Sequence, residues 1–142
     1  MSERGQKAYD YFMQGYNCAQ AVLLAFSHKT GLKKNPAALV ASGFGAGIGK
    51  TRNVCGTVTG MIMAADLING YENPKDSNAK IHTYDMVQSL LNEFKAENGS
   101  IIKENAMKKI PRLFLINEQV NIIKNALALS FAGSQRKFLK II

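Results

Sequence analysis

Two cysteines and a glycine-rich segment carry the residue types in this chain that could do chemistry. Cys55 follows a run of glycines at every second position, which are Gly43, Gly45, Gly47 and Gly49. Glycine loses more backbone entropy than any other residue and supplies no side chain, so this run predicts a loop whose backbone passes close to another group. Lys50 and Arg52 lie between the run and Cys55. Since neighbouring cations and a helix N-terminus both favour the thiolate over the thiol, we predict a reactive thiol at Cys55.

Cys18, the only other cysteine in the sequence, occupies a similar place. It follows Asn17 at the start of an apolar segment, as Cys55 follows Asn53, and asparagine is a preferred N-cap residue. We therefore predict that both thiols lie at helix N-termini, with pKa values lowered from about 8.5 towards 7. Cys18 and Cys55 are the candidate catalytic residues for redox chemistry, with Cys55 the more nucleophilic. In the alternative interpretation, both are small buried core residues.

The sequence does not identify a cofactor, and the chemistry to consider is a thiolate-bound metal or an iron–sulfur centre. Cys18 and Cys55 are the candidate metal ligands. Two cysteines allow a disulfide or a two-thiolate metal site, but not a closed four-thiolate site. The candidate cofactor-binding residues, through close backbone approach and N–H groups donated to sulfur, are Gly45, Gly47, Gly49 and Gly56.

Other chemical motifs fail on spacing. A phosphate-binding P-loop requires a glycine where Phe44 stands, so nucleotide binding is not favoured. Four further titratable residues have neither metal-ligand spacing to a cysteine nor an identifiable carboxylate partner, and these are His28, His82, Asp66 and Asp85. We interpret the histidines as structural.

The spacing of apolar residues predicts an all-α fold, a small single-domain helical bundle with a glycine-rich loop. A first helix carries the apolar stripe Tyr9, Phe12, Met13 and Tyr16; a second runs from Asn17 to about Thr30; a short one covers 37–42. A helix from about Cys55 to Ile68 buries Val58, Met61, Ile62 and Ala65, and a long helix over 80–97 turns Tyr84, Val87, Leu91 and Phe94 inward. Gly56 and Gly60, four residues apart, leave a flat strip where another backbone can approach closely.

The charge of the chain is concentrated in its last third. The net charge is +8, and residues 101–142 hold eight Lys or Arg against two Asp or Glu. This basic tail lacks aromatic interleaving, so nucleic-acid binding is not favoured. No apolar run reaches the ~20 residues of a membrane span, and no signal peptide is visible. We expect a cytoplasmic protein without membrane insertion, a single helical domain over 1–142 with an atypical tail from 101.

Residues 1–100 resemble a family of redox-active proteins named for its cysteine pattern, C_GCAxxG_C_C. Three segments carry the resemblance in the right order: 15–23 around Cys18, the glycine run 43–49, and 55–60, where Thr57 stands in place of the usual alanine. Phe94 to Ser100 resembles the approach to the third cysteine of the family, which follows a Gly-Ser. The resemblance implies a small helical protein with four cysteines that act in redox chemistry or hold a metal centre.

The last two cysteines of that pattern are absent from this chain. Reading the codons of 124–127 two nucleotides further on permits Lys-Cys-Pro, and the same offset through 103–106 permits another cysteine. One offset that restores both cysteines suggests a frameshift near residues 100–103. Resequencing codons 95–142 tests it.

Three functions remain open from the sequence. The first is a redox or metal-binding protein in which Cys18 and Cys55 come together, with a redox partner of unknown identity. The second is a helical interaction or assembly module with structural cysteines, which includes association with a second copy of the chain. The third is nucleic-acid binding through the basic tail. The sequence does not decide whether a substrate is turned over.

Overall fold

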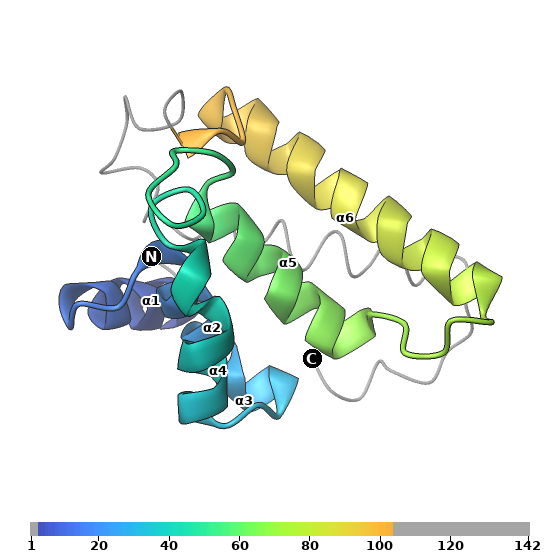
Figure 1. The fold of residues 1–142 in the computed structure, drawn as a ribbon, viewed down its shortest axis with the longest axis horizontal. Coiled ribbons are helices and arrows are strands. Elements are labelled where there is room, and N and C mark those ends of the chain that lie inside the picture. The colour runs from blue at the N-terminus through green and yellow to red at the C-terminus, as the bar shows by residue number, and fades with distance from the viewer. Residues whose placement is uncertain (1–2, 104–142) are drawn as a thin grey trace.

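The structure is a computed structural model that describes residues 3–103 of the chain. Six α-helices and a 3₁₀ turn follow one another in the described residues (Figure 1). They are α1 (Glu3–Met13), α2 (Cys18–Ala25), α3 (Ser27–Thr30), α4 (Lys34–Ala41), η1 (Ser42–Phe44), α5 (Gly56–Asn69) and α6 (Ser77–Asn98). The predicted all-α fold is confirmed. The region after 103, which includes the second offset cysteine position over 124–127, lies outside the described residues.

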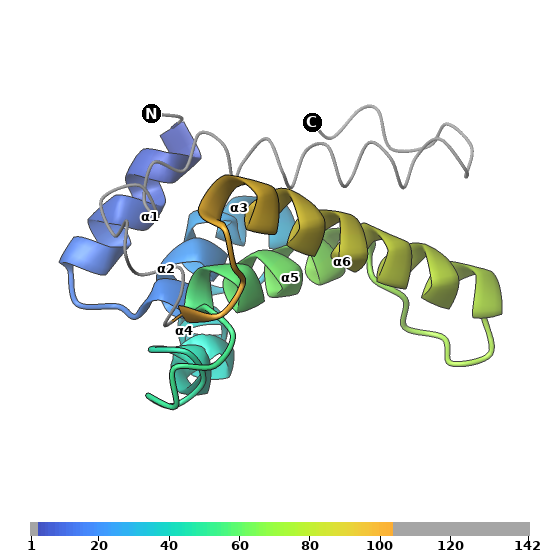
Figure 2. The ribbon, with the colours of Figure 1, turned by 90° about the horizontal axis from the view of Figure 1, so that it is seen from above.

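The central element is α2. Its residues from Ala21 to Ala25, and Phe26 after it, are all buried, because the segment is apolar on every side. α1, α4 and α5 pack around it, and α6 runs antiparallel beside α5 (Figures 1 and 2). The glycine-rich loop lies at the end of the molecule where α5 begins and α6 ends (Figure 1).

Small residues let α5 approach α2 closely, as the sequence predicts. A Cβ added at Gly60 would lie 2.8 Å from the carbonyl oxygen of Ala19, and one added at Gly56 would lie 3.1 Å from the Ala19 nitrogen. The Gly56/Gly60 strip is therefore occupied by the chain's own α2. A partner helix could use this strip only if α2 moved away.

The apolar stripe of α1 is partly exposed, and one residue of α6 that was predicted to point inward is exposed. Tyr9 and Met13 of α1 are 37% and 65% exposed, because α1 packs on α2 through the smaller Gly5 and Ala8. Tyr84 of α6 is 51% exposed. The buried residues of α6 are Thr83, Met86, Leu90 and Phe94, so the prediction for Phe94 is confirmed, while the predicted Val87 and Leu91 are partly buried against the core. Large apolar side chains at helical spacing indicate a helix. They do not determine which face of that helix packs against the neighbouring helix.

The predicted second helix is divided in two. Phe26 interrupts the helical run between α2 and α3, and Gly31 ends α3 in the left-handed conformation, with φ of 69°. The short helix predicted over 37–42 begins earlier, at Lys34, with Pro36 inside its first turn. None of the helices among residues 3–103 is long and apolar enough to span a membrane.

Candidate functional site

Cys18 is the first residue of α2, and a capping box fixes its position. The Asn17 side chain accepts from the Gln20 N–H at 3.0 Å, and the Gln20 side chain accepts from the Asn17 N–H at 3.0 Å. The Asn17 side chain also donates to the Ser42 carbonyl at 2.9 Å, which ties the start of α2 to the end of α4. The predicted N-cap role of Asn17 is confirmed.

Cys55 is the N-cap residue of α5, and it makes no side-chain capping bond. Its N–H donates to the Ile101 carbonyl at 2.8 Å, and the Lys103 N–H donates to the Asn53 carbonyl at 2.9 Å. These bonds flank an antiparallel bridge between Val54 and Ile102. The prediction that Asn53 caps this helix is wrong, because its backbone pairs with the segment that follows α6.

The close packing of the two helix starts brings Cys18 beside the Cys55-Gly56 peptide. The Cys18 Cβ lies 3.1 Å from the position of a Cβ added at Gly56. The charge of Cys55 also contributes to raising the pKa of the Cys18 thiol. Both thiols are free. Two residues 37 positions apart in sequence therefore form one site.

The two thiols differ in their access to solvent. Cys55 is 3% exposed, whereas Cys18 is only partly buried. Cys18 is therefore the more accessible of the two cysteines. The sequence predicted Cys55 to be the more reactive thiol from the nearby Lys50 and Arg52, but these residues are exposed on the loop.

The predicted lowering of the Cys18 pKa is wrong. Burial raises the pKa of the Cys18 thiol, and the charge of Cys55 raises it further. The Lys103 ammonium and the backbone N–H of Cys18 itself act in the opposite direction. Desolvation of the thiolate outweighs these favourable groups. Sequence reasoning missed Lys103, and no motif marks it, because it reaches the site through the pairing of 101–103 with 53–55.

Alkylation of Cys18 is expected to follow a pH profile with its midpoint above the ordinary range of a cysteine thiol. Because the folded-state pKa is raised, the free energy of unfolding falls as the pH rises through that range. Lys103→Gln is expected to move the midpoint up, and Cys55→Ser to move it down. Iodoacetamide labelling of Cys18 between pH 6 and 11, followed by mass spectrometry, measures the midpoint for the wild type and for both variants. A wild-type midpoint below the ordinary cysteine pKa would contradict the burial argument.

The glycine-rich loop forms a left-handed turn. Every residue from Ala46 to Lys50 has positive φ, between 54° and 76°, as does Arg52 at 59°. Left-handed backbone is unfavourable for residues with a Cβ, above all for the β-branched Ile48. Glycine removes this cost at Gly47 and Gly49.

The N–H groups of this loop satisfy its own carbonyls. Gly49 donates to Gly43 at 2.8 Å and Asn53 donates to Gly47 at 2.9 Å, and the N–H groups of all residues in between also go to loop carbonyls. For residues 48–53, the expectation that loop N–H groups are donated to sulfur is therefore wrong. Close backbone approach does occur, since a Cβ at Gly45 would lie 2.6 Å from the Asn17 side chain. The loop thus supports the residue that caps the helix of Cys18.

Thr57, two residues after Cys55, has a fully buried side chain with an unsatisfied hydroxyl. Among residues 3–103, its Oγ1 has no hydrogen-bond partner. An unpaired buried hydroxyl is destabilising, because it has lost its bonds to water. Alanine, which is usual at this position in the family that the sequence resembles, avoids that loss.

Thr57→Val is expected to raise the free energy of unfolding by about 1–2 kcal/mol, because it removes the unpaired hydroxyl and keeps the side-chain volume. Urea denaturation measures the change. Thr83→Val is the matched control, since the buried Thr83 hydroxyl donates to Ala79 at 2.9 Å, and its loss is expected to lower stability. A destabilised Thr57→Val would show that the hydroxyl has a partner in solution.

A metal centre has too few ligands among the described residues. No group of three or more His, Cys, Asp or Glu side chains within residues 3–103 could hold a metal ion. Cys18 and Cys55 supply two thiolates, whereas closed thiolate sites have four ligands. Within residues 3–103, Cys18 and Cys55 therefore provide a dithiol but not a closed four-thiolate site.

Comparison with known proteins identifies a family. No curated protein and no solved structure matches this chain. The sequence pattern of one family, described as "Putative redox-active protein (C_GCAxxG_C_C)", matches residues 16–122, about three quarters of the chain. This match includes both cysteines and extends beyond residue 100, where the resemblance noted from the sequence ends. The chain belongs to the C_GCAxxG_C_C family.

Proposed function

We propose that this protein is a thiol–disulfide redox protein in which Cys18 and Cys55 alternate between the dithiol and the disulfide. The observation that carries the proposal is the pairing of a partly exposed thiol with a buried one at two abutting helix N-termini. An accessible thiol can attack a partner, and a protected neighbour can then resolve the mixed disulfide.

The reaction proceeds in two exchange steps. The Cys18 thiolate attacks a disulfide of the partner, the partner's S–S bond breaks, and one partner sulfur leaves as a thiolate that takes up a proton. The Cys55 thiolate then attacks the Cys18 sulfur of the mixed disulfide and expels the second partner thiolate. The Cys18–Cys55 pair has lost two electrons, and the partner disulfide has gained them.

The raised pKa of Cys18 has two opposite effects on the rate at which Cys18 attacks a disulfide. Less thiolate is present at neutral pH, although a thiolate of higher pKa is intrinsically more nucleophilic. Lys103 supports the thiolate form, because its charge lowers the pKa of Cys18. The loop glycines hold Asn17 and hence the start of α2 in place. The proposal sets this cycle in the cytoplasm, where free thiols are kept reduced.

The cysteine variants test the proposal. Reduced wild-type protein treated with a 2-thiopyridyl disulfide is expected to end as a Cys18–Cys55 disulfide, about 2 Da lighter than the dithiol, with release of pyridine-2-thione. Cys55→Ser is expected to stop at a stable mixed disulfide on Cys18. Cys18→Ser is expected to react at least tenfold more slowly, because Cys55 is buried. Equal reaction rates for Cys18→Ser and wild type would overturn the proposal.

A further inference from the structure

We propose that the redox partner is a protein with an acidic surface, which docks on the end of the molecule that carries Cys18. This inference rests on the proposed thiol exchange and names the kind of partner that the exchange serves. It follows from the distribution of charge, from cations close to the thiol and from an exposed apolar residue beside them.

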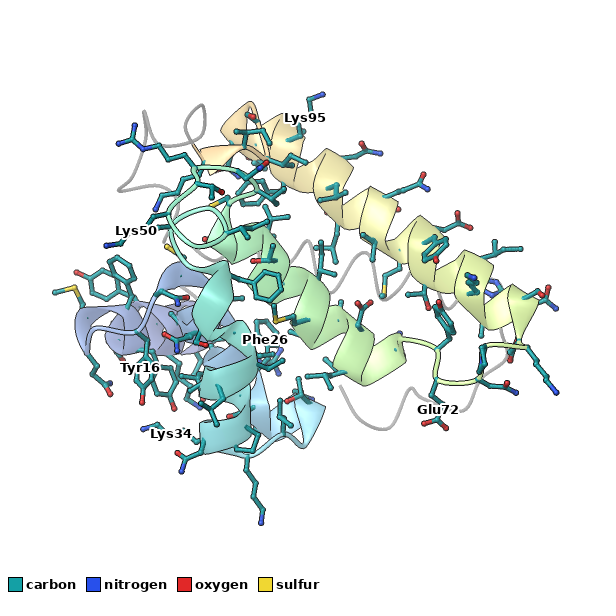
Figure 3. The ribbon with its side chains drawn as sticks, viewed as in Figure 1. Tyr16, Phe26, Lys34, Lys50, Glu72 and Lys95 are labelled. Atoms are coloured by element: carbon teal, nitrogen blue, oxygen red, sulfur yellow. The ribbon has the colours of Figure 1, made fainter. Side chains whose placement is uncertain are left out.

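Acidic residues are absent from the segment of the chain that carries both cysteines. Residues 11–65 contain no Asp or Glu, but they hold five cations, which are Lys29, Lys33, Lys34, Lys50 and Arg52. Residues 66–98 hold six Asp or Glu against three Lys. Figure 3 shows Lys34 and Lys50 at one end of the molecule and Glu72 near the other. At the end of the fold where α5 begins and α6 ends, Lys50, Arg52, Lys95 and Lys103 outnumber Glu93 and Glu97, so the thiol end carries a net positive charge.

Cations lie close to the accessible thiol. Lys103 lies beside the segment of Cys55, because its N–H donates to the Asn53 carbonyl at 2.9 Å, and its ammonium lowers the pKa of Cys18. The Lys34 ammonium lies over the ring of Tyr16, 5.7 Å from the ring centroid. Tyr16 precedes Cys18 by two positions in the sequence. Lys50 is exposed on the loop that packs against Asn17 (Figure 3). A negatively charged surface would be attracted to this end, and such steering raises association rates by about 10- to 1,000-fold.

An apolar anchor adjoins the cations. Leu39 of α4 is 74% exposed and borders a groove of about 370 Å³, lined also by Gln20, Asn35, Ala38 and Ser42. The Gln20 side chain donates to the Ala38 carbonyl at 2.8 Å, so the groove adjoins the first turn of α2 and hence Cys18. A buried apolar centre within a charged rim is typical of protein–protein interfaces. This combination favours a protein over a nucleic acid as the acidic partner.

Two peptides of equal length test the inference. Each carries one cysteine as its 2-thiopyridyl disulfide, one in a Glu-rich and one in a Lys-rich sequence. With the full reduced chain at low salt, the Glu-rich peptide is expected to react at least tenfold faster. The difference is expected to disappear at about 0.5 M salt, because mobile ions screen the attraction.

The ratio of the two rates is the readout, because a change in thiol pKa affects both peptides alike. Lys50→Gln/Lys103→Gln is expected to lower the ratio at least threefold. Lys75→Gln/Lys80→Gln removes the same charge at the start of α6 and is expected to leave the ratio unchanged. A leucine beside the peptide cysteine is expected to raise the reaction rate about threefold, because it can pack against Leu39. The protein variant Leu39→Gln is expected to lose this increase, and the control variant Leu67→Gln is expected to keep it.

The outcomes distinguish a failure of the acidic-partner inference from a failure of the proposed thiol exchange. Equal rates for both peptides, with the reaction still dependent on Cys18, would overturn the acidic partner and leave the thiol exchange standing. Loss of the dependence on Cys18 would overturn the exchange itself. A DNA oligonucleotide that suppresses the reaction as strongly as an unreactive Glu-rich peptide would assign this surface to nucleic acid and overturn the inference.

Discussion

Phe94→Ala is expected to lower the free energy of unfolding by about 3–5 kcal/mol, the usual cost of removing a fully buried aromatic ring. Phe94 is 0% exposed and is one of the largest fully buried side chains in residues 3–103. It lies in the last turns of α6, just before the segment that pairs with residues 53–55. Urea denaturation of the variant and the wild type measures the loss.

The same variant is expected to loosen the thiol site. The Cys55 N–H is bonded to the Ile101 carbonyl, and Phe94 anchors the end of the helix that delivers Ile101. Amide hydrogen exchange at Cys55 should therefore accelerate in Phe94→Ala. Ile81→Ala is the control on the same helix, because Ile81 is 57% exposed, and a cost below about 1 kcal/mol is expected. A similar loss in both variants would show that burial of Phe94 does not hold α6 in place.

Gly60→Ala is expected to lower the free energy of unfolding by about 2–3 kcal/mol through overpacking of α2 against α5. The new Cβ would lie 2.8 Å from the Ala19 carbonyl oxygen and 3.0 Å from the Val22 Cβ. The first of these atoms is backbone, so the helices must separate. Alanine gains roughly 1 kcal/mol of helix propensity over glycine, and the stated loss is what remains after that gain.

Gly43→Ala is the matched control for this substitution. No atom lies within 4 Å of a Cβ added at Gly43, and its φ is not positive. The expected change is between zero and a stabilisation of a few tenths of a kcal/mol. If Gly60→Ala proved as harmless as Gly43→Ala, the contact between α2 and α5 would have to be looser than the structure shows.

The features that the sequence predicts correctly are those encoded locally. Asn17 caps α2, because Gln20 stands at the position that completes a capping box. Gly56 and Gly60 mark the closest helix contact, because their spacing of four puts both on one face. Apolar periodicity is enough to indicate each long helix.

The features that the sequence does not predict depend on residues far apart along the chain. Asn53 has the side chain of an N-cap, but its backbone is engaged by Lys103, and Cys55 becomes the cap residue. The direction of the Cys18 pKa shift follows from burial, which a position at a helix start does not reveal. The left-handed turn over 46–50 includes Ile48, which no propensity scale would place there.

The hydrogen bond between the Cys55 N–H and the Ile101 carbonyl is a late step in the formation of the thiol site during synthesis. It joins residues about 46 positions apart. Because the ribosome adds about 5–20 residues per second, roughly 2–9 s pass between the addition of Cys55 and the addition of Ile101. Throughout that interval the nascent chain already holds both thiols but lacks the segment that pairs with residues 53–55. The last backbone bond of the thiol site can therefore form only after Ile101 has been added to the chain.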